Sequence, residues 1–376
     1  MQKKKLYFLY SKSILLYAVV LSALFLFVLN AKGCMSAVRE ALIMCAQTVI
    51  PSLFPFFVFS GLLIQSGFIP VAGAVITPVI HPLFRVSGSG ALAFVIGIVS
   101  GYPMGAKMTA DLYREKLISR TEGHKLLPFC NNSGPLFIIG AVGGGMLGNV
   151  RIGFFLYMVH LAAALMVACC FRFYGESAQR GSASVRSAVG SSLREHYRQQ
   201  RGGSAVSECV RSAVNTILLI CGFIVFFSAF TECLKPLLAL VRNDTARLLL
   251  SGMLEVTAGV NRVCSAQSAL PQKLVMISAL LGFGGICVHL QVLGMLSGTD
   301  LKMKTYLVGK LLHAMFSAFL CMASLRFLPS EVITVWNPTF SAPEASLISP
   351  ISVLSALAVA VSSGYFALRR KVRRKK

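Results

Sequence analysis

The sequence predicts an all-α membrane protein that crosses the bilayer several times. Of its 376 residues, 56% are hydrophobic and only 13% are charged, whereas a soluble domain carries about 25% charged residues. Runs such as Ile14 to Leu29 and Leu156 to Phe171 contain no Asp, Glu, Lys or Arg, which is typical of transmembrane helices. The composition therefore excludes an ordinary soluble domain.

The basic residues give the second observation. Lys and Arg number 36 against 13 Asp and Glu, so the net charge is +23. A charge of this size is also seen in nucleic-acid-binding proteins, but here the basic residues lie in loops and tails between apolar segments. Cytoplasmic loops of membrane proteins have this pattern. We therefore expect a lipid bilayer as the surroundings and no nucleic acid as a partner.

Hydropathy and Lys/Arg placement together predict about eight spans. They are expected near 14–31, 40–66, 126–148, 151–172, 212–234, 273–297, 305–328 and 349–368. Two further apolar segments, Gly88 to Ala110 and Leu248 to Val263, are interrupted by Ser100–Gly105 and by Ser251-Gly252 and Gly259. Irregular backbone at membrane depth is tolerated only where protein or a water-filled cavity satisfies it. We interpret both as re-entrant hairpins.

The N-terminal run has two interpretations. Lys3, Lys4 and Lys5 before an apolar stretch resemble the start of a secretory signal peptide. The stretch exceeds the usual h-region of about 7–15 residues, which favours a retained first helix. The positive-inside rule then places both termini and the basic stretch 173–211 in the cytoplasm. The tail after residue 368 is rich in Lys and Arg, whereas the loop 329–348 has neither.

The two halves of the chain resemble each other at an offset of about 150 residues. Ser100-Gly101 has a counterpart in Ser251-Gly252, and Tyr157 has one in Tyr306. By the charge count the copies begin with spans of opposite direction, so the sequence predicts inverted repeats with a site between them. The predicted division is 1–36, the first helix; 37–173, the first repeat; 174–211, a cytoplasmic basic linker; 212–328, the second repeat; and 329–376, a last helix with the basic tail.

The chemistry of the first break favours an anion. Asn131, Asn132 and Ser133 precede Gly134-Pro135 inside an apolar span. A half-helix that begins at Pro135 aims free backbone N–H groups and its positive dipole end at the break. These polar residues are also able to bond neighbouring helices, as buried amides and hydroxyls do in many membrane proteins.

Three stretches resemble the sporulation integral membrane protein family YlbJ, also called SpoVV. They are Ser100 to Lys107, Asn131 to Gly143 and Gly282 to Val292, and the resemblance covers roughly residues 40 to 330. Asn132 stands where we expect Thr in that family. The resemblance implies a nucleoside-recognition, or Gate-domain, protein whose fold is similar to concentrative nucleoside transporters and to the membrane gate of ferrous iron transporters.

The resemblance further implies a transport function. It implies movement of dipicolinic acid from the mother cell across the outer forespore membrane during sporulation. The expected cargo is thus a small, planar, anionic solute. Transport of a nucleoside and a membrane scaffold for a sporulation complex remain alternatives, as do passive and ion-coupled modes, either direction of movement and assembly into a homo-oligomer.

The candidate substrate-binding residues lie at or beside the interruptions. They are Ser100, Tyr102, Lys107, Asn131, Asn132, Ser133, Gly134, Glu255, Arg262, Gly284, His289 and Gln291. Lys107 and Arg262 are either cargo ligands or snorkelling side chains. Glu255 either binds a coupling cation or proton, or pairs with Arg262.

An enzyme is not predicted. The chain has no GxxxxGK[ST], HExxH or GxSxG motif. Its 11 cysteines are scattered, without CxxC or a Cys/His cluster at ligand spacing, so we interpret them as small hydrophobic residues. We expect no catalytic residues, no metal and no cofactor.

Overall fold

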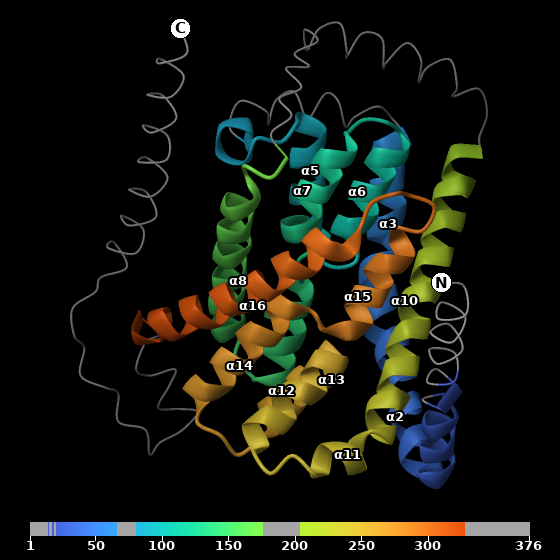
Figure 1. The fold of residues 1–376 in the computed structure, drawn as a ribbon, viewed down its shortest axis with the longest axis vertical. Helices are drawn as coiled ribbons and strands as arrows, with labels where there is room; N and C mark the ends of the chain where they lie inside the picture. Colours follow the sequence, from blue (N-terminus) through green and yellow to red (C-terminus); the bar gives the residue numbers. More distant parts are fainter. Residues whose placement is uncertain (1–13, 15–16, 19, 66–79, 176–203, 328–376) are drawn as a thin grey trace, which may run out of the picture.

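The computed structural model describes residues 14, 17–18, 20–65, 80–175 and 204–327. Every regular element in these ranges is helical (Figure 1). Four of the described helices are long and apolar enough to cross a membrane, and a bent pair near the N-terminus makes up to five. The four are Val150–Phe171, Val206–Cys233, Leu270–Met295 and Met303–Ser324. The all-α membrane class is confirmed, whereas the predicted span 349–368 lies outside the described residues.

The N-terminal region differs from the two straight spans predicted at 14–31 and 40–66. A helix over Val20–Leu29 meets Ala31–Gln47 at an angle of 95°. The loop expected between the two spans is instead helical: α2 (Ala31–Met44) continues through the π-helical turn η1 (Cys45–Val49) into α3 (Ile50–Gln65). The wide turn precedes Pro51, which has no N–H to donate to the preceding turn.

The first interrupted segment is a pair of helices, as predicted. α5 (Gly88–Ser100) begins at Ser87, whose side chain accepts a hydrogen bond from the Gly90 N–H, and α6 (Met104–Arg114) follows the short break. Next come α7 (Arg120–Cys130), the π-helix η2 (Leu136–Met146) and α8 (Val150–Phe171). The predicted span 126–148 is therefore broken between α7 and η2, where the sequence predicted a half-helix start.

The second half follows the same order of elements. α10 (Ser204–Cys233) and the short α11 (Lys235–Ala239) lead to α12 (Asp244–Leu254) and α13 (Val256–Ser265). α14 (Leu270–Phe283) and α15 (Gly285–Met295) meet at Gly284, and α16 (Met303–Ser324) ends in a 3-10 turn, η3 (Leu325–Phe327). Each half thus has a short-helix pair, a broken long helix and a 22-residue helix.

The interruption of the second short-helix pair lies between the two predicted positions. We expected breaks at Ser251-Gly252 and at Gly259, but α12 continues to Leu254, the chain leaves helical geometry at Glu255, and Gly259 lies inside α13. Both glycines serve packing instead: a Cβ on Gly259 of α13 would lie 2.0 Å from the Gly252 Cα, and one on Gly252 would lie 2.5 Å from Leu280 Cδ1. The glycines allow α12 and α13 to cross closely without breaking α12.

The interruptions of both halves converge in the middle of the molecule. Figure 1 shows α5, α6 and α7 in the upper half and α12, α13 and α14 in the lower half. α16 runs across the middle and packs against α7, α8 and α14, while α10 packs along α2 and α3. The non-helical residues therefore meet where helices from both halves surround them.

Candidate functional site

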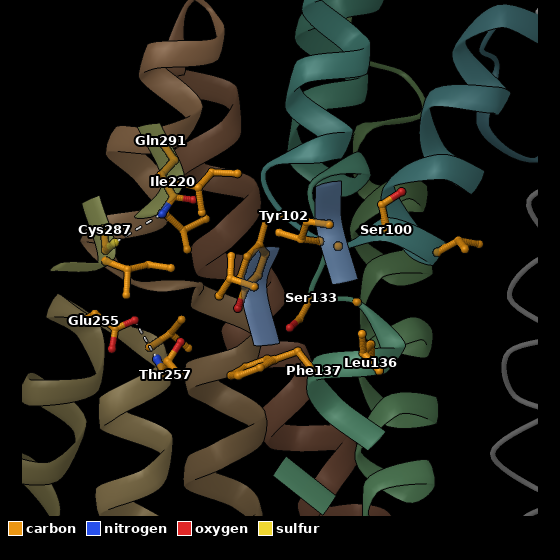
Figure 2. Close-up of a pocket in the computed structure, with 18 residues that line it drawn as sticks. Ser100, Tyr102, Ser133, Leu136, Phe137, Ile220, Glu255, Thr257, Cys287 and Gln291 are labelled. Carbon is orange, nitrogen blue, oxygen red and sulfur yellow. Dashed lines mark hydrogen bonds between the residues drawn. The ribbon is translucent and has the colours of Figure 1, made fainter. Parts of the chain in front are cut away.

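A cavity lies between the interrupted elements of the two halves. Its volume is about 210 Å³. Ser100, Ser133 and Leu136 from the first half lie on one side, and Glu255 and Gln291 from the second half lie on the other (Figure 2). η1, α3 and α10 complete the wall with Val49, Leu53, Ile220 and Ile224. The cavity therefore combines apolar walls with a small number of polar groups, as ligand sites generally do.

Three buried hydroxyl groups at the cavity have no hydrogen-bond partner in the described part of the chain. They belong to Ser100, Tyr102 and Ser133, and those of Tyr102 and Ser133 lie near each other. A buried polar group without a partner is costly, by about 1–3 kcal/mol. All three side chains line the cavity, so a solute or water there is able to satisfy them.

The start of η2 adds backbone donors to the same wall. Gly134, Leu136 and Phe137 line the cavity, and the first N–H groups of a helix have no partner within it. The Ser133 N–H is already used, because it donates to His160 Nε2 at 3.0 Å. The half-helix predicted from Pro135 is thus present, and its positive end faces the cavity.

Two glycines allow the breaks of the first half to touch. Gly101 has φ +85°, a conformation that L side chains rarely adopt, and a Cβ there would lie 2.7 Å from the Gly134 nitrogen. A Cβ on Gly134 would in turn lie 3.0 Å from the Ser100 carbonyl oxygen. This close crossing places the Ser100 and Ser133 hydroxyls at the same cavity.

The second half presents an acidic group. The Glu255 side chain is only 2% exposed, and its Oε1 and Oε2 accept hydrogen bonds from the Thr257 and Ala258 N–H groups at 2.9 and 2.6 Å. The carboxylate therefore caps α13 and occupies its positive end. Gln291 also lines the cavity, and its Nε2 lies 3.5 Å from the Cys287 sulfur.

The two cations proposed from the sequence lie elsewhere. Lys107 donates to Asp111 Oδ2 at 2.8 Å, and Arg262 lies 3.9 Å from Glu232 Oε2. Neither lines the cavity. Each lies beside a carboxylate, and the structure does not bring these two side chains together with the hydroxyls. Arg262 does not pair with Glu255 within 4.0 Å.

Three other candidates form the layer behind the first break. Asn131 Nδ2 donates to the Tyr306 hydroxyl at 3.3 Å, and His289 Nδ1 lies 3.0 Å from the same hydroxyl. Asn132 Nδ2 donates to the Phe129 carbonyl at 2.7 Å. All three are buried and none of them lines the cavity. They hold the break in place from behind.

Sequence reasoning missed Lys310, the fully buried basic residue of this layer. It lies on α16 within the predicted span 305–328, and its Nζ donates to the Asn131 carbonyl at 2.8 Å. A lysine inside a transmembrane segment is itself a signal of function. Tyr306, which the sequence marks only as the counterpart of Tyr157, belongs to the same layer, and so does His313.

Comparison with known proteins supplies the family. The Gate family model, described as nucleoside recognition, matches residues 46–173. The chain is 34% identical over 330 residues to the sporulation integral membrane protein YlbJ of Bacillus subtilis (strain 168), which covers 81% of this chain and 78% of that protein. The chain belongs to this family. No solved structure matches it.

Family membership confirms the resemblance seen in the motifs. It also agrees with the spans of the structure, so the chain is an integral, multi-pass membrane protein with a Gate domain. The matched residues 46–173 include α3, the first short-helix pair, the first break and α8. The Gate match therefore covers the donor side of the cavity but not Glu255. Within the described residues, no three His, Cys, Asp or Glu side chains gather as metal ligands.

Proposed function

We propose that this protein is a transporter of dipicolinic acid, and not an enzyme, acting across the outer forespore membrane during sporulation. One observation carries the proposal: a cavity lies where interrupted helices from both halves meet, and three hydroxyls without a partner among the described residues and a helix N-terminus face it. Interrupted helices at membrane depth are the usual construction of a transport site. The apolar walls suit an aromatic ring, and the donors suit carboxylates.

The halves of the proposed transporter are inverted repeats, with residues 37–173 and 212–328 as the repeating units. The equal order of elements supports this, as does the entry of α5 and α6 from one end of the molecule and of α12 and α13 from the other (Figure 1). Both termini and the linker 174–211 are cytoplasmic in this proposal, because the basic residues concentrate there.

A specific observation favours a neutral nucleoside as the second candidate cargo. The cavity-lining residues include Glu255 and, among the described residues, no Lys, Arg or His. A carboxylate repels a dianion and is able to accept hydrogen bonds from ribose hydroxyls. The matched family model is also described as nucleoside recognition.

Uptake into proteoliposomes separates the two cargoes. Vesicles that contain only the purified full chain should take up labelled dipicolinate, and an excess of unlabelled uridine should not compete. Selective uptake of uridine instead would transfer the assignment to the nucleoside. Uptake of neither solute would remove the transport proposal.

A serine pair provides the matched control for the site. Ser133→Ala should lower dipicolinate affinity about tenfold or more, since a hydrogen bond to a charged group contributes about 1.5–3 kcal/mol. Ser278 on α14 is likewise buried with an unpartnered hydroxyl but does not line the cavity, so Ser278→Ala should transport normally. Equal effects of the two substitutions would show that Ser133 acts through packing alone.

A further inference from the structure

Lys310 is buried without an acidic partner. Its side chain is 0% exposed, and no Asp or Glu of the described residues lies within 4.0 Å of its Nζ. The Nζ contacts the Asn131 carbonyl oxygen at 2.8 Å and His313 Nδ1 at 3.2 Å. A buried cation whose charge is not balanced is strongly unfavourable, so Lys310 either loses its proton or keeps it beside a balancing anion.

The hydrogen bonds around Lys310 show how the two neighbouring imidazoles are used. His313 Nε2 lies 3.1 Å from the His160 carbonyl oxygen, which only accepts, so Nε2 carries the proton and Nδ1 is left to accept from Lys310. His160 Nε2 accepts from the Ser133 N–H, so its own proton is on Nδ1. Both imidazoles are neutral in this arrangement, so Lys310 is the group of the cluster that carries a positive charge when it is protonated.

Among the described residues, the groups that face Lys310 include no carboxylate. The break after α7 contributes the Asn131 carbonyl, α8 contributes His160, and α15 contributes His289 through the Tyr306 hydroxyl. α14 also packs against α16, and its buried Lys273 donates to the Cys264 carbonyl at 2.8 Å. None of these groups supplies a negative charge.

Within the described part of the chain, the cavity offers space for an anion in front of the first break. Asn131, whose carbonyl binds Lys310, is two residues from Ser133, whose side chain lines the cavity. Lys310 thus lies behind the first break, and the cavity lies in front of it. An anion at Ser133 and at the start of η2 would be separated from the ammonium by this one segment of backbone, in surroundings that screen charge poorly.

We propose that Lys310 is the specificity-determining counter-charge that makes this cavity select an anion. It is a positioning residue that holds the first break through the Asn131 carbonyl and acts on the cargo through the field of its charge, without touching it. The proposal rests on the anionic cargo proposed above. Lys310 takes the role that the sequence suggested for Lys107 and Arg262, which lie beside Asp111 and Glu232 and do not line the cavity.

Equilibrium binding to the purified full chain tests this inference. The probes are dipicolinate and its neutral isostere, pyridine-2,6-dicarboxamide. The wild type should prefer the dianion. Lys310→Gln, which retains a donor for the Asn131 carbonyl, should lose at least tenfold in dipicolinate affinity and less than threefold in dicarboxamide affinity. Lys273→Gln is the matched control, a buried lysine that also donates to a backbone carbonyl, and should keep both affinities.

The outcomes separate a charge effect from a structural one. Equal loss for both probes in Lys310→Gln, unchanged dipicolinate affinity, or a wild type without preference for the dianion would each overturn the proposal. If Lys310→Gln fails to fold, Lys310→Arg keeps the charge and should keep the preference; a folded Arg variant without preference would overturn it equally. Selective binding of the dianion without uptake in proteoliposomes would instead refute transport and leave the role of Lys310 standing.

Discussion

The two interrupted regions have the same architecture and opposite chemistry. In the first, the helix N-terminus at η2 is open and the Ser100 and Ser133 hydroxyls lack partners. In the second, the N-terminus of α13 is already capped by the carboxylate of Glu255. The first region therefore offers donors to a ligand, whereas the second offers an acceptor. The difference shows that a repeated order of helices does not repeat the chemistry of a site.

The charges behind and within the cavity follow the same division. Lys310 lies behind the donor region, and Glu255 lies in the wall of the acceptor region. A cargo bound between them would meet a favourable and an unfavourable field on opposite sides if it is anionic. The preference of the protein for a dianion or a neutral solute consequently depends on the balance between these two residues.

The largest expected effect concerns the close packing of α5 against α7 in the first region. A Cβ on Gly97 would lie 1.8 Å from the Cys130 carbonyl oxygen, while one on Gly222 would meet nothing within 4 Å. Gly97→Ala should lower the melting temperature and the membrane abundance, because overpacking costs about 1–3 kcal/mol or more where backbone must move. Gly222→Ala, in α10, should be neutral or slightly stabilising. Thermal unfolding of both variants in detergent measures the difference.

The second prediction concerns the negative charge of Glu255 in the acceptor region. Glu255→Gln removes the negative charge from the cavity and keeps an oxygen that caps α13. Dipicolinate should therefore bind about threefold to tenfold more tightly. The loss of folding stability should not exceed that of a lost helix cap, about 0.5–2 kcal/mol. Glu232→Gln is the control, since Glu232 pairs with Lys235 and does not line the cavity. Weaker dipicolinate binding together with lost uridine binding would show that Glu255 is itself a cargo ligand.

The third prediction compares one polar side chain from each region. Gln291 has its Nε2 within 3.5 Å of the Cys287 sulfur, whereas the Ser133 hydroxyl has no partner in the described residues. Gln291→Ala should therefore weaken dipicolinate binding by about threefold, less than Ser133→Ala, because a weak internal contact is lost along with any contact to the cargo. The same titration measures the dipicolinate affinity of both variants. A larger loss of affinity in Gln291→Ala than in Ser133→Ala would contradict the division into donor and acceptor regions.

The sequence predicts the architecture better than the chemistry. The first breaks are marked by residues that act on the backbone locally: glycines that free it, Gly101 and Gly134, and prolines that restrict it, Pro103 and Pro135. The structure has breaks at these positions. Ser251-Gly252 misplaces the second break because a glycine that permits close crossing of helices looks the same in the sequence as one that ends a helix. The local sequence around a glycine does not show which helix packs against that glycine.

The counter-charge could not be predicted for a related reason. Lys107 and Arg262 follow the breaks in the sequence, but their neutralisation by Asp111 and Glu232 depends on side-chain geometry and tertiary packing. Lys310 is 179 residues from Asn131, and only the crossing of α16 over α7 brings them together. Long-range contacts of this kind decide which cation faces a site.

The smallest expected effect concerns the frame beside both regions. The Cys34 and Cys233 sulfurs are 3.3 Å apart and join α2 to α10, and η1, α3 and α10 supply apolar wall to the cavity. Oxidation with copper phenanthroline should link these thiols, and peptide mapping of the unreduced protein by mass spectrometry should identify the bond, which Cys34→Ala removes. If the donor and acceptor regions move against a fixed frame, the linked protein should transport within about twofold of the reduced protein, since a disulfide fixes only the segments it joins. Arrest of transport by the bond, reversed by reductant and absent in Cys34→Ala, would show instead that α2 and α10 separate during each cycle.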